Sequence, residues 1–434
     1  MRRRAAAAII AAVLALPAAA AALAQAPAAA ETFDKVWSIV RDTAFDKSFD
    51  SAAWDRVRDE LRPKAVAATT PGELRAVLAD MLGRIGLSHF AVIPSTPDAP
   101  GDAVDLSGQP GFNVRLTNGK LLVTSVDPNR AAAAAGVHAG WIIDAIDGTP
   151  MASLLDPIVR DTPGRVAQLE AWRMAQRRLR GPSHSRTSVT FVDGSGAHVT
   201  KAIERTPEPG IPVNVGSLPT MYVRVSSALK ETRSGRSVGV IGFNVWMTAV
   251  DKPFQQALDR FRSADGIVID LRGNPGGLAA MIMGIAGHFV ADRATLGVMR
   301  TRDSELRFAV NPRLVNSVGE RVEPYAGPLA ILVDGMTGSA SECFAGGMQS
   351  LGRARVFGQT SMGQALPALF DRLPNGDVLI HAWGDFVTGT GVRIEGRGVV
   401  PDEPVATTRE DLLAGRDSTL EAALGWIDSR EARK

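Results

Sequence analysis

The chain has 434 residues, of which 45% are hydrophobic and 22% are charged, and its formal net charge is +2. This composition excludes a disordered protein, which has fewer apolar residues and more net charge, and it excludes a collagen or coiled coil, since Gly and Pro follow no period. The near-neutral charge gives no indication of a nucleic-acid surface.

Residues 1–30 resemble a secretory signal peptide. The arginines at 2–4 precede an apolar run from Ala5 to about Ala22, and small-residue A-x-A cleavage sites follow at 22–24 and 24–26. The alternative is a retained membrane anchor, because the run is nearly long enough to span a bilayer. We expect cleavage, no stable membrane insertion afterwards, and a soluble periplasmic or otherwise exported protein.

Residues 31–98 are expected to form an N-terminal helical domain. Phe33, Val36, Trp37 and Val40 follow the spacing of one helix face, and Thr70-Pro71 is typical of a helix start. The helical pattern ends just before Ser88-His89.

Residues 104–206 are expected to form a second unit, in which strands surround a helical insert at about 151–179. Gly111-Phe112-Asn113-Val114 begins its first strand, and a Gly-punctuated strand at 140–148 follows a short helix. This order resembles a PDZ domain, although Trp141 stands where that family has Asp. The resemblance implies that Gly111, Phe112, Asn113 and Val114 receive the C-terminal carboxylate of a protein or peptide by strand addition.

Residues 207–430 alternate between apolar strand-like runs and helices. The expected strands are Val238–Val245, Gly266–Leu271, Leu329–Val333, Arg355–Phe357 and Val378–Ala382, with helices at 253–262 and 278–290 among others. Such alternation predicts a mostly parallel, buried sheet covered by helices, so the chain is expected to be a multi-domain α/β protein.

Ser341 follows the apolar run 329–333 and a Gly-rich turn, and it lies at the start of a predicted helix. Ser339 and Glu342 fit a capping box, which puts Ser341 in the first turn of that helix. Unpaired N–H groups and the helix dipole favour negative charge there, so Ser341 can attack a carbonyl while the Glu342 N–H stabilises the oxyanion. The same motif also occurs in an ordinary capped helix.

A second Gly-rich turn, Gly273-Asn274-Pro275-Gly276-Gly277, follows another strand and offers free N–H groups. The motifs D-L-R-G-N-P-G-G, T-G-S-A-S-E, G-R-A-x-V-x-G and R-I-E-G-R-G-V-V-P-D occur in this order. Together with the two preceding units, they resemble the C-terminal processing peptidase and tricorn-core family of serine peptidases. The resemblance implies a crotonase-like or ClpP-like α/β core, with no metal or organic cofactor. It also implies a Ser341 nucleophile, with an oxyanion hole from the Glu342 N–H and the N–H of Gly276 or Gly277.

A lysine general base, as used by the tail-specific branch of that family, is not expected. Gln364 stands at the lysine position, and the only lysine after Ser341 is Lys434. The tricorn branch uses Ser, His, Ser and Glu, which implies His89 as the base, oriented by Ser88 and Glu395. A nearby Glu395 is expected to raise the pKa of His89.

Two residues compete with that assignment. His381 is the rival base because it lies in the predicted core, and Asp385 is the rival orienting carboxylate. Cys343, the only cysteine, is expected to be a buried, unreactive side chain, and it excludes both an intramolecular disulfide and a cysteine-based zinc site.

The sequence is compatible with three functions. The first is an exported serine endopeptidase that acts on proteins or peptides through Ser341, with tricorn-type Ser/His/Glu catalysis. The second is a catalytically inactive scaffold of the same fold that binds partners through its PDZ unit. The third is a crotonase-like core acting on acyl thioesters, and export argues against it because coenzyme A is cytoplasmic.

Overall fold

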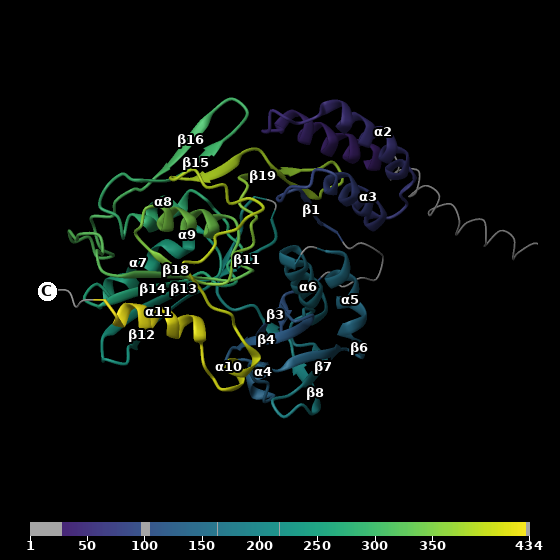
Figure 1. Cartoon of the computed structure of the whole chain (residues 1–434). Helices are drawn as coiled ribbons and strands as arrows, with labels where there is room; N and C mark the ends of the chain where they lie inside the picture. Colours follow the sequence, from purple (N-terminus) through teal and green to yellow (C-terminus); the bar gives the residue numbers. More distant parts are fainter. Residues whose placement is uncertain (1–27, 97–104, 163, 217, 431–434) are drawn as a thin grey trace, which may run out of the picture.

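The computed structural model describes residues 28–96, 105–162, 164–216 and 218–430. The predicted signal peptide lies outside these ranges except for residues 28–30, which already belong to a helix over residues 28–43. Three lobes are visible in Figure 1: a helical lobe, a small lobe that carries β3–β8, and a larger α/β core. The chain is therefore a multi-domain α/β protein, as the sequence predicts.

The helical lobe contains the helix over 28–43, α2 (Ser51–Ala67) and α3 (Pro71–Gly83). Thr70 caps α3 through its side chain and Pro71 occupies the first turn, as the sequence predicts. Apolar side chains on the inner faces of these helices, including Phe33 and Leu78, are fully buried in one cluster.

A three-stranded antiparallel sheet in the order β1-β20-β19 packs against these helices. Its strands are β1 (Ala91–Ile93), β19 (Ala368–Arg372) and β20 (Val378–Ala382). The prediction that 378–382 belongs to the parallel sheet is therefore wrong. A buried ion pair between Arg75 of α3 and Asp377, at 2.6 Å, holds this hairpin against the helical lobe.

The small lobe is an antiparallel sheet in the order β3-β4-β5-β7-β8, with the short β6 beside β5. Its strands are β3 (Phe112–Thr117), β4 (Lys120–Val126), β5 (Ile142–Ile146), β6 (Thr149–Pro150), β7 (Arg186–Val192) and β8 (His198–Glu204). The helices are α4 (Ala131–Ala134), α5 (Met151–Asp161) and α6 (Gly164–Leu179), and α6 packs along the edge strand β3. A two-stranded ribbon of β2 (Gly108–Gln109) and β9 (Thr206–Pro207) closes the lobe.

The core contains a six-stranded sheet in the order β12-β13-β14-β17-β18-β22, parallel except for the first pair. The strands are β12 (Val225–Glu231), β13 (Ser237–Phe243), β14 (Gly266–Asp270), β17 (Leu329–Val333), β18 (Arg355–Gly358) and β22 (Glu403–Pro404). Every residue of β17 is buried, as expected for a central parallel strand with both faces covered.

Helices cover both faces of this sheet. One face packs against η1 (Thr248–Val250), α7 (Asp251–Arg260), α8 (Met281–Ala286) and α9 (Ala340–Ser350), and the other against α11 (Ser418–Asp428). The remaining elements are the pair β10 (Ile211–Val213) and β11 (Met221–Val223), the sheet of β15 (Thr295–Arg300), β16 (Glu305–Ala309) and β21 (Asp385–Thr388), and α10 (Arg409–Leu413).

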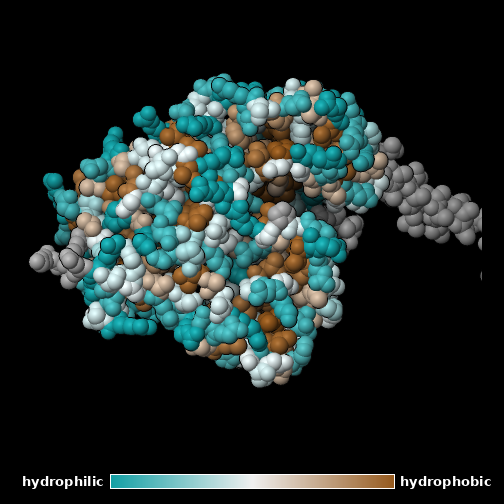
Figure 2. All heavy atoms as spheres, in the orientation of Figure 1, coloured by the Kyte–Doolittle hydropathy of each residue, from teal (hydrophilic) through white to brown (hydrophobic). Residues whose placement is uncertain are grey.

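The visible surface is mostly hydrophilic, and Figure 2 shows apolar side chains around the indentation between the helical lobe and the small lobe. In the described ranges, every helix is too short or too polar to cross a bilayer.

Candidate active site

Two strand-to-helix turns meet at the carboxyl ends of the neighbouring parallel strands β14 and β17. The Gly338 N–H donates to the Asn274 carbonyl at 3.0 Å, and the Thr337 hydroxyl donates to the Leu271 carbonyl at 2.9 Å. The Asp334 carboxylate accepts the Gly273 N–H at 2.8 Å. These bonds fasten the turn before Ser341 to the Gly-rich turn that the sequence singles out.

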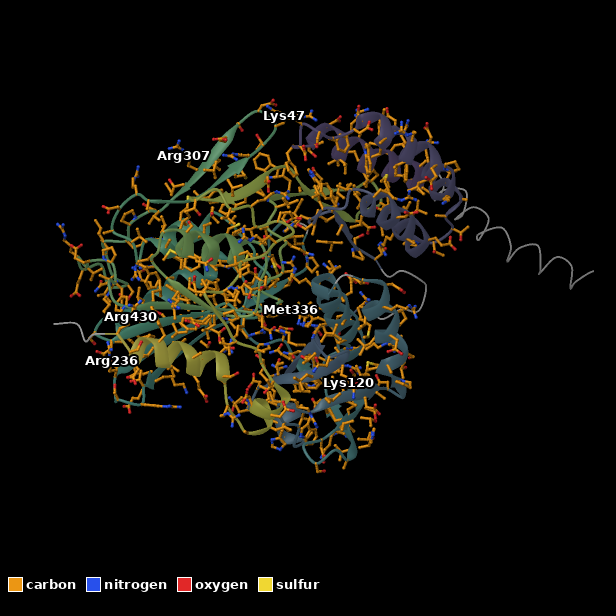
Figure 3. All side chains as sticks on the ribbon, viewed as in Figure 1. Lys47, Lys120, Arg236, Arg307, Met336 and Arg430 are labelled. Atoms are coloured by element: carbon orange, nitrogen blue, oxygen red, sulfur yellow. The ribbon has the colours of Figure 1, made fainter. Side chains whose placement is uncertain are left out.

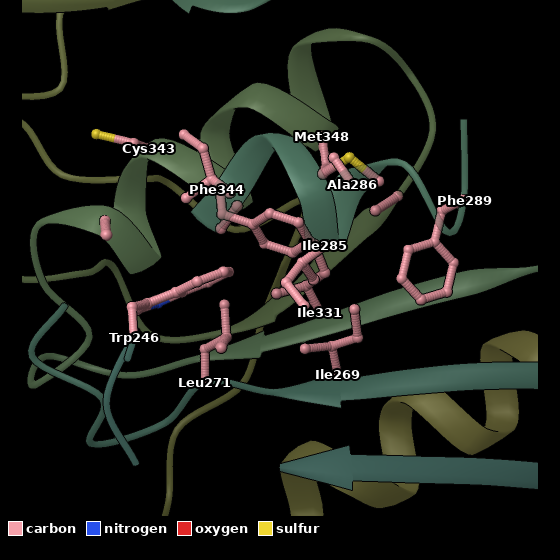
Figure 4. Packing of buried hydrophobic residues seen from close by; sticks show 14 of the residues in the cluster. Trp246, Ile269, Leu271, Ile285, Ala286, Phe289, Ile331, Cys343, Phe344 and Met348 are labelled. Atoms are coloured by element: carbon pink, nitrogen blue, oxygen red, sulfur yellow. The ribbon is translucent and has the colours of Figure 1, made fainter. Parts of the chain in front are cut away.

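Ser341 is the second residue of α9 and is fully buried. The preceding N-cap, Ser339, has φ +52° and ψ −120°, a conformation that non-glycine residues rarely adopt. Ser341 Oγ accepts a hydrogen bond of 2.8 Å from Nε1 of Trp246. Figure 4 shows the Trp246 ring beneath the start of α9, next to Phe344 and Leu271. The sequence did not predict a role for Trp246, because this residue follows an apolar run and its pattern indicates only a core position.

Of the three predicted oxyanion donors, two N–H groups already have a hydrogen-bond acceptor within the protein. The Glu342 N–H donates to the Ser339 carbonyl at 2.9 Å, and the Gly276 N–H donates to Asn274 Oδ1 at 3.0 Å. For the Gly277 N–H, the described part of the chain provides no acceptor. Both glycines have positive φ, and a Cβ on Gly276 would lie 2.5 Å from the Ser339 Cβ.

The Glu342 side chain joins the segment 361–364 to the start of α9 by hydrogen bonds. Its carboxylate accepts hydrogen bonds from Ser361 Oγ and from the N–H groups of Gly363, Gln364 and Ser339, at 2.5–3.0 Å. Burial nevertheless raises the pKa of Glu342 to about 7, because desolvation outweighs these donors. The bond to Ser339 is the carboxylate half of the predicted capping box.

Glu395, Ser88 and His89 form one hydrogen-bonded chain. Glu395 is buried, and its carboxylate accepts the Ser88 N–H and the Ser88 hydroxyl, each at 2.9 Å. The Ala365 N–H also donates to this carboxylate at 2.9 Å. Ser88 Oγ lies 2.7 Å from Nδ1 of His89, whose backbone has φ +59°. The fold thus brings the adjacent pair Ser88 and His89 together with Glu395, which lies 307 positions after Ser88 in the sequence.

The His89 ring makes no hydrogen bond to Ser341 in the ranges that the structure describes. Burial lowers the pKa of His89 to about 4. The sequence-based expectation of a raised pKa is therefore wrong: desolvation dominates, and Ser88 rather than Glu395 is the group in contact with the imidazole.

The rival residues have other partners. His381 is fully buried between Thr43 Oγ1, at 3.0 Å from Nδ1, and Asp371 Oδ2, at 2.7 Å from Nε2. Asp385 forms an ion pair with Arg393 at 2.6 Å. Burial raises the pKa of the Cys343 thiol well above its ordinary value, in keeping with an unreactive side chain.

Of the predicted peptide-binding residues 111–114, Phe112, Asn113 and Val114 begin β3, the edge strand of the small lobe, and Gly111 immediately precedes it. Phe112 and Val114 are buried, and Asn113 is exposed. The next residue, Arg115, forms an ion pair of 2.9 Å with Asp334, so this edge touches the turn before Ser341. Burial opposes ionisation of Asp334, but Arg115 and the Gly273 N–H hold its pKa below the ordinary value. In Figure 3, Met336, which belongs to the turn before Ser341, lies where the core meets the small lobe.

Within those same ranges, His, Cys, Asp and Glu side chains form no group of three or more that is placed to hold a metal ion.

Two family models match separate parts of the chain. Peptidase family S41 matches residues 237–405, and the tricorn protease C1 domain matches residues 27–83. The carboxyl-terminal-processing protease of Synechocystis sp. is 25% identical over 378 residues, which cover 85% of this chain and 79% of that protein. The putative tricorn protease homolog 2 of Streptomyces coelicolor is 23% identical over 424 residues, or 92% of this chain and 32% of that protein.

Solved structures share the fold over most of the chain. The photosystem II D1 C-terminal processing protease has a TM-score of 0.56 and 20% identity, covering 92% of this chain and 97% of its own. Mature CPAF has a TM-score of 0.58 and 12% identity, and the match covers 93% of this chain and 96% of the CPAF chain.

Proposed function

We propose that this chain, which belongs to peptidase family S41 and is a serine-type peptidase, is an exported endopeptidase that forms an acyl-enzyme on Ser341. His89 is the general base, and Ser88 and Glu395 orient it. The observation that supports this assignment best is the hydrogen-bonded chain from Glu395 through Ser88 to His89. Of the histidines weighed as the base, His89 alone is linked to a carboxylate through a serine.

In the proposed reaction His89 takes the hydroxyl proton of Ser341 as Oγ attacks the scissile carbonyl carbon. The carbonyl π electrons move to oxygen, and the Gly277 N–H stabilises that oxyanion. The C–N bond then breaks, and the leaving amine receives the proton from His89. Water, deprotonated by His89, attacks the acyl-enzyme, and Oγ leaves with its bonding pair and regains a proton.

The contact between His89 and Ser341 forms, in this proposal, when a substrate opens the buried site. Catalytic hydrogen bonds are often long or absent before substrate binds. The relatives named as carboxyl-terminal-processing proteases suggest a substrate cleaved near its C-terminus. The edge strand β3, with Gly111 to Val114, is proposed to bind that C-terminus in the manner of a PDZ domain.

A serine-reactive fluorophosphonate tests the proposed nucleophile. We expect the full chain to be labelled on Ser341 and Ser341→Ala to be unlabelled, with intact-mass spectrometry and peptide mapping as the readout. Equal labelling of Ser341→Ala would refute the assignment. Absence of labelling in the wild type would instead favour the second candidate, an inactive binding protein, for which the complete burial of Ser341 is the observation in favour.

The proposed peptide site has its own test. A peptide with an apolar C-terminal residue should bind the Ser341→Ala chain, and its C-terminal amide should bind much more weakly, because the backbone N–H groups receive a carboxylate. Equal affinity of acid and amide in isothermal titration calorimetry would refute C-terminal recognition.

A further inference from the structure

Trp246 provides the hydrogen-bond partner of the proposed nucleophile. Its indole N–H donates to Ser341 Oγ at 2.8 Å, and both side chains are fully buried. Among the described residues, no other side chain or backbone group makes a hydrogen bond to this oxygen. The donor therefore acts on Oγ in a dry environment, where such a bond is stronger than in water.

The indole is held rigidly in place. The backbone N–H of Trp246 donates to the Gly276 carbonyl, and the Trp246 carbonyl accepts the Leu278 N–H, each at 2.8 Å. The backbone of Trp246 is therefore joined to the Gly-rich turn that carries Gly276 and Gly277. The ring packs edge-on against Phe243, with centroids 4.8 Å apart, and against Phe344 at 5.2 Å. A donor fixed in this way needs no reorganisation when charge develops nearby.

We propose that Trp246 is a catalytic residue that stabilises negative charge on Ser341 Oγ; this inference rests on the proposed function of Ser341. The oxygen becomes more negative when His89 removes its proton, and again when the C–Oγ bond of the acyl-enzyme breaks and Oγ leaves with the electron pair. An indole N–H only donates and does not titrate in the working pH range. It therefore occupies one lone pair and leaves the serine proton available to His89.

The opposite role is a latch, in which Trp246 holds Ser341 away from His89 and must release it. The two roles predict opposite effects when the donor is removed. A catalytic donor makes the reaction slower when it is lost, and a latch makes the reaction faster.

The experiment replaces the N–H without changing the shape of the ring. Benzothienylalanine, in which sulfur replaces the indole N–H, and a fluorinated tryptophan, which keeps it, are each introduced at position 246 of the full chain. We expect the fluorophosphonate to react with Ser341 of the benzothienyl form about 10- to 100-fold more slowly than with the wild type. This reduction in rate is typical of removing a hydrogen bond to a charged group. The fluorinated form should react at close to the wild-type rate.

Conventional variants supply the controls. Trp246→Phe should behave like the benzothienyl form in kcat, with little change in KM, because the donor acts on a reacting atom rather than on substrate binding. Trp426→Phe should keep wild-type turnover, because Trp426 of α11 packs against Phe357 on the opposite face of the sheet from Trp246. Circular dichroism and Tm confirm folding, and the isosteric pair decides the matter if Trp246→Phe unfolds.

Unchanged or faster reaction of the benzothienyl form would overturn the inference and favour a packing role or a latch. Those outcomes leave the proposed function intact, because the wild type is still labelled on Ser341. Failure of the wild type to react would refute the proposed function itself.

Discussion

The Ser88 hydroxyl stands between a carboxylate and an imidazole, and this determines which nitrogen of His89 carries the proton. Ser88 Oγ donates its only proton to Glu395 and therefore accepts from Nδ1 of His89. The neutral ring then has Nε2 unprotonated, which is the form that a general base requires. In the proposed mechanism Glu395 acts on His89 through Ser88 and is therefore a positioning residue.

The pH dependence of Ser341 reactivity follows from the environment of His89. Burial lowers the pKa of His89 to about 4, so the ring is neutral and competent above that pH and becomes charged as the pH falls through it. We expect the fluorophosphonate reaction to keep its rate down to about pH 5 and to lose it near pH 4. His89→Ala should be as inactive as Ser341→Ala. A midpoint at or above 6.5 would contradict a base whose charged form is disfavoured by desolvation.

Glu395→Gln should reduce kcat by about 10²- to 10⁴-fold, the range expected for a group that orients a catalytic histidine. The amide offers donors where Ser88 and Ala365 already donate, so the chain to His89 is disrupted. The matched control is Asp385→Asn, whose carboxylate pairs with Arg393 and should matter little. Steady-state turnover of a peptide substrate separates the two variants, and comparable losses would reassign the orienting role.

At the scale of elements, the site depends on how closely two turns approach. The turns after β14 and β17 are joined by the bonds from Gly338 to Asn274 and from Gly273 to Asp334. That approach leaves no room for a side chain at Gly276. The same turn carries Gly277, whose N–H is the proposed oxyanion donor.

Gly276→Ala is therefore expected to displace Ser339 and reduce the rate of Ser341 labelling by about 100-fold or more, as misplacement near 1 Å can. Gly391→Ala is the matched control. It also has positive φ, at +84°, but a Cβ there meets nothing within 4 Å. Both variants carry backbone strain, so Tm should fall in both, while labelling should fall only at Gly276. Normal labelling of Gly276→Ala would contradict the close approach of the two turns.

At the scale of the whole molecule, residues from the three lobes surround the candidate site. The helical lobe leads into Ser88 and His89, the core supplies Ser341 and Glu395, and the small lobe contacts the turn before Ser341 through the Arg115–Asp334 ion pair. The buried Arg75–Asp377 pair connects the helical lobe to the hairpin of β19 and β20. Reactivity at the site is thus expected to depend on contacts between lobes as well as on local geometry.

The stability of the core should fall on mild acidification because of His288. Its ring is buried, and neither nitrogen has a hydrogen-bond partner in the described part of the chain. Burial, with a contribution from Arg313, lowers its pKa from 6.5 to about 4. The unfolded chain binds a proton more readily, so stability is complete above about pH 6.5 and falls as the pH drops toward 4.

From pH 7 to pH 5 the free energy of unfolding should decrease by about 2 kcal/mol from this residue. Urea unfolding at the two pH values measures the change, and His288→Leu should reduce it by that amount. An identical pH dependence in the variant would show that His288 is not the responsible group.

Much of the architecture and part of the site followed from the sequence alone. The helix and strand pattern predicted α3, the central strand β17 and the helix that carries Ser341, because hydrophobic period, capping residues and glycine turns are local properties. Motif order likewise drew attention to Ser88, His89 and Glu395, and the structure places these three in hydrogen-bond contact.

Other features were decided by tertiary structure. β20 pairs with β1 and packs against the helical lobe, where a buried ion pair also joins residues 302 positions apart. An apolar strand pattern cannot specify its partner sheet. The lowered pKa of His89 arises from burial by distant segments, which overrode the expected effect of a nearby carboxylate. Trp246 reached Ser341 across 95 positions, where no local signal exists. Local sequence pattern specified which side chains are candidates for the site, and only long-range packing decided which of them meet and how far each is removed from water.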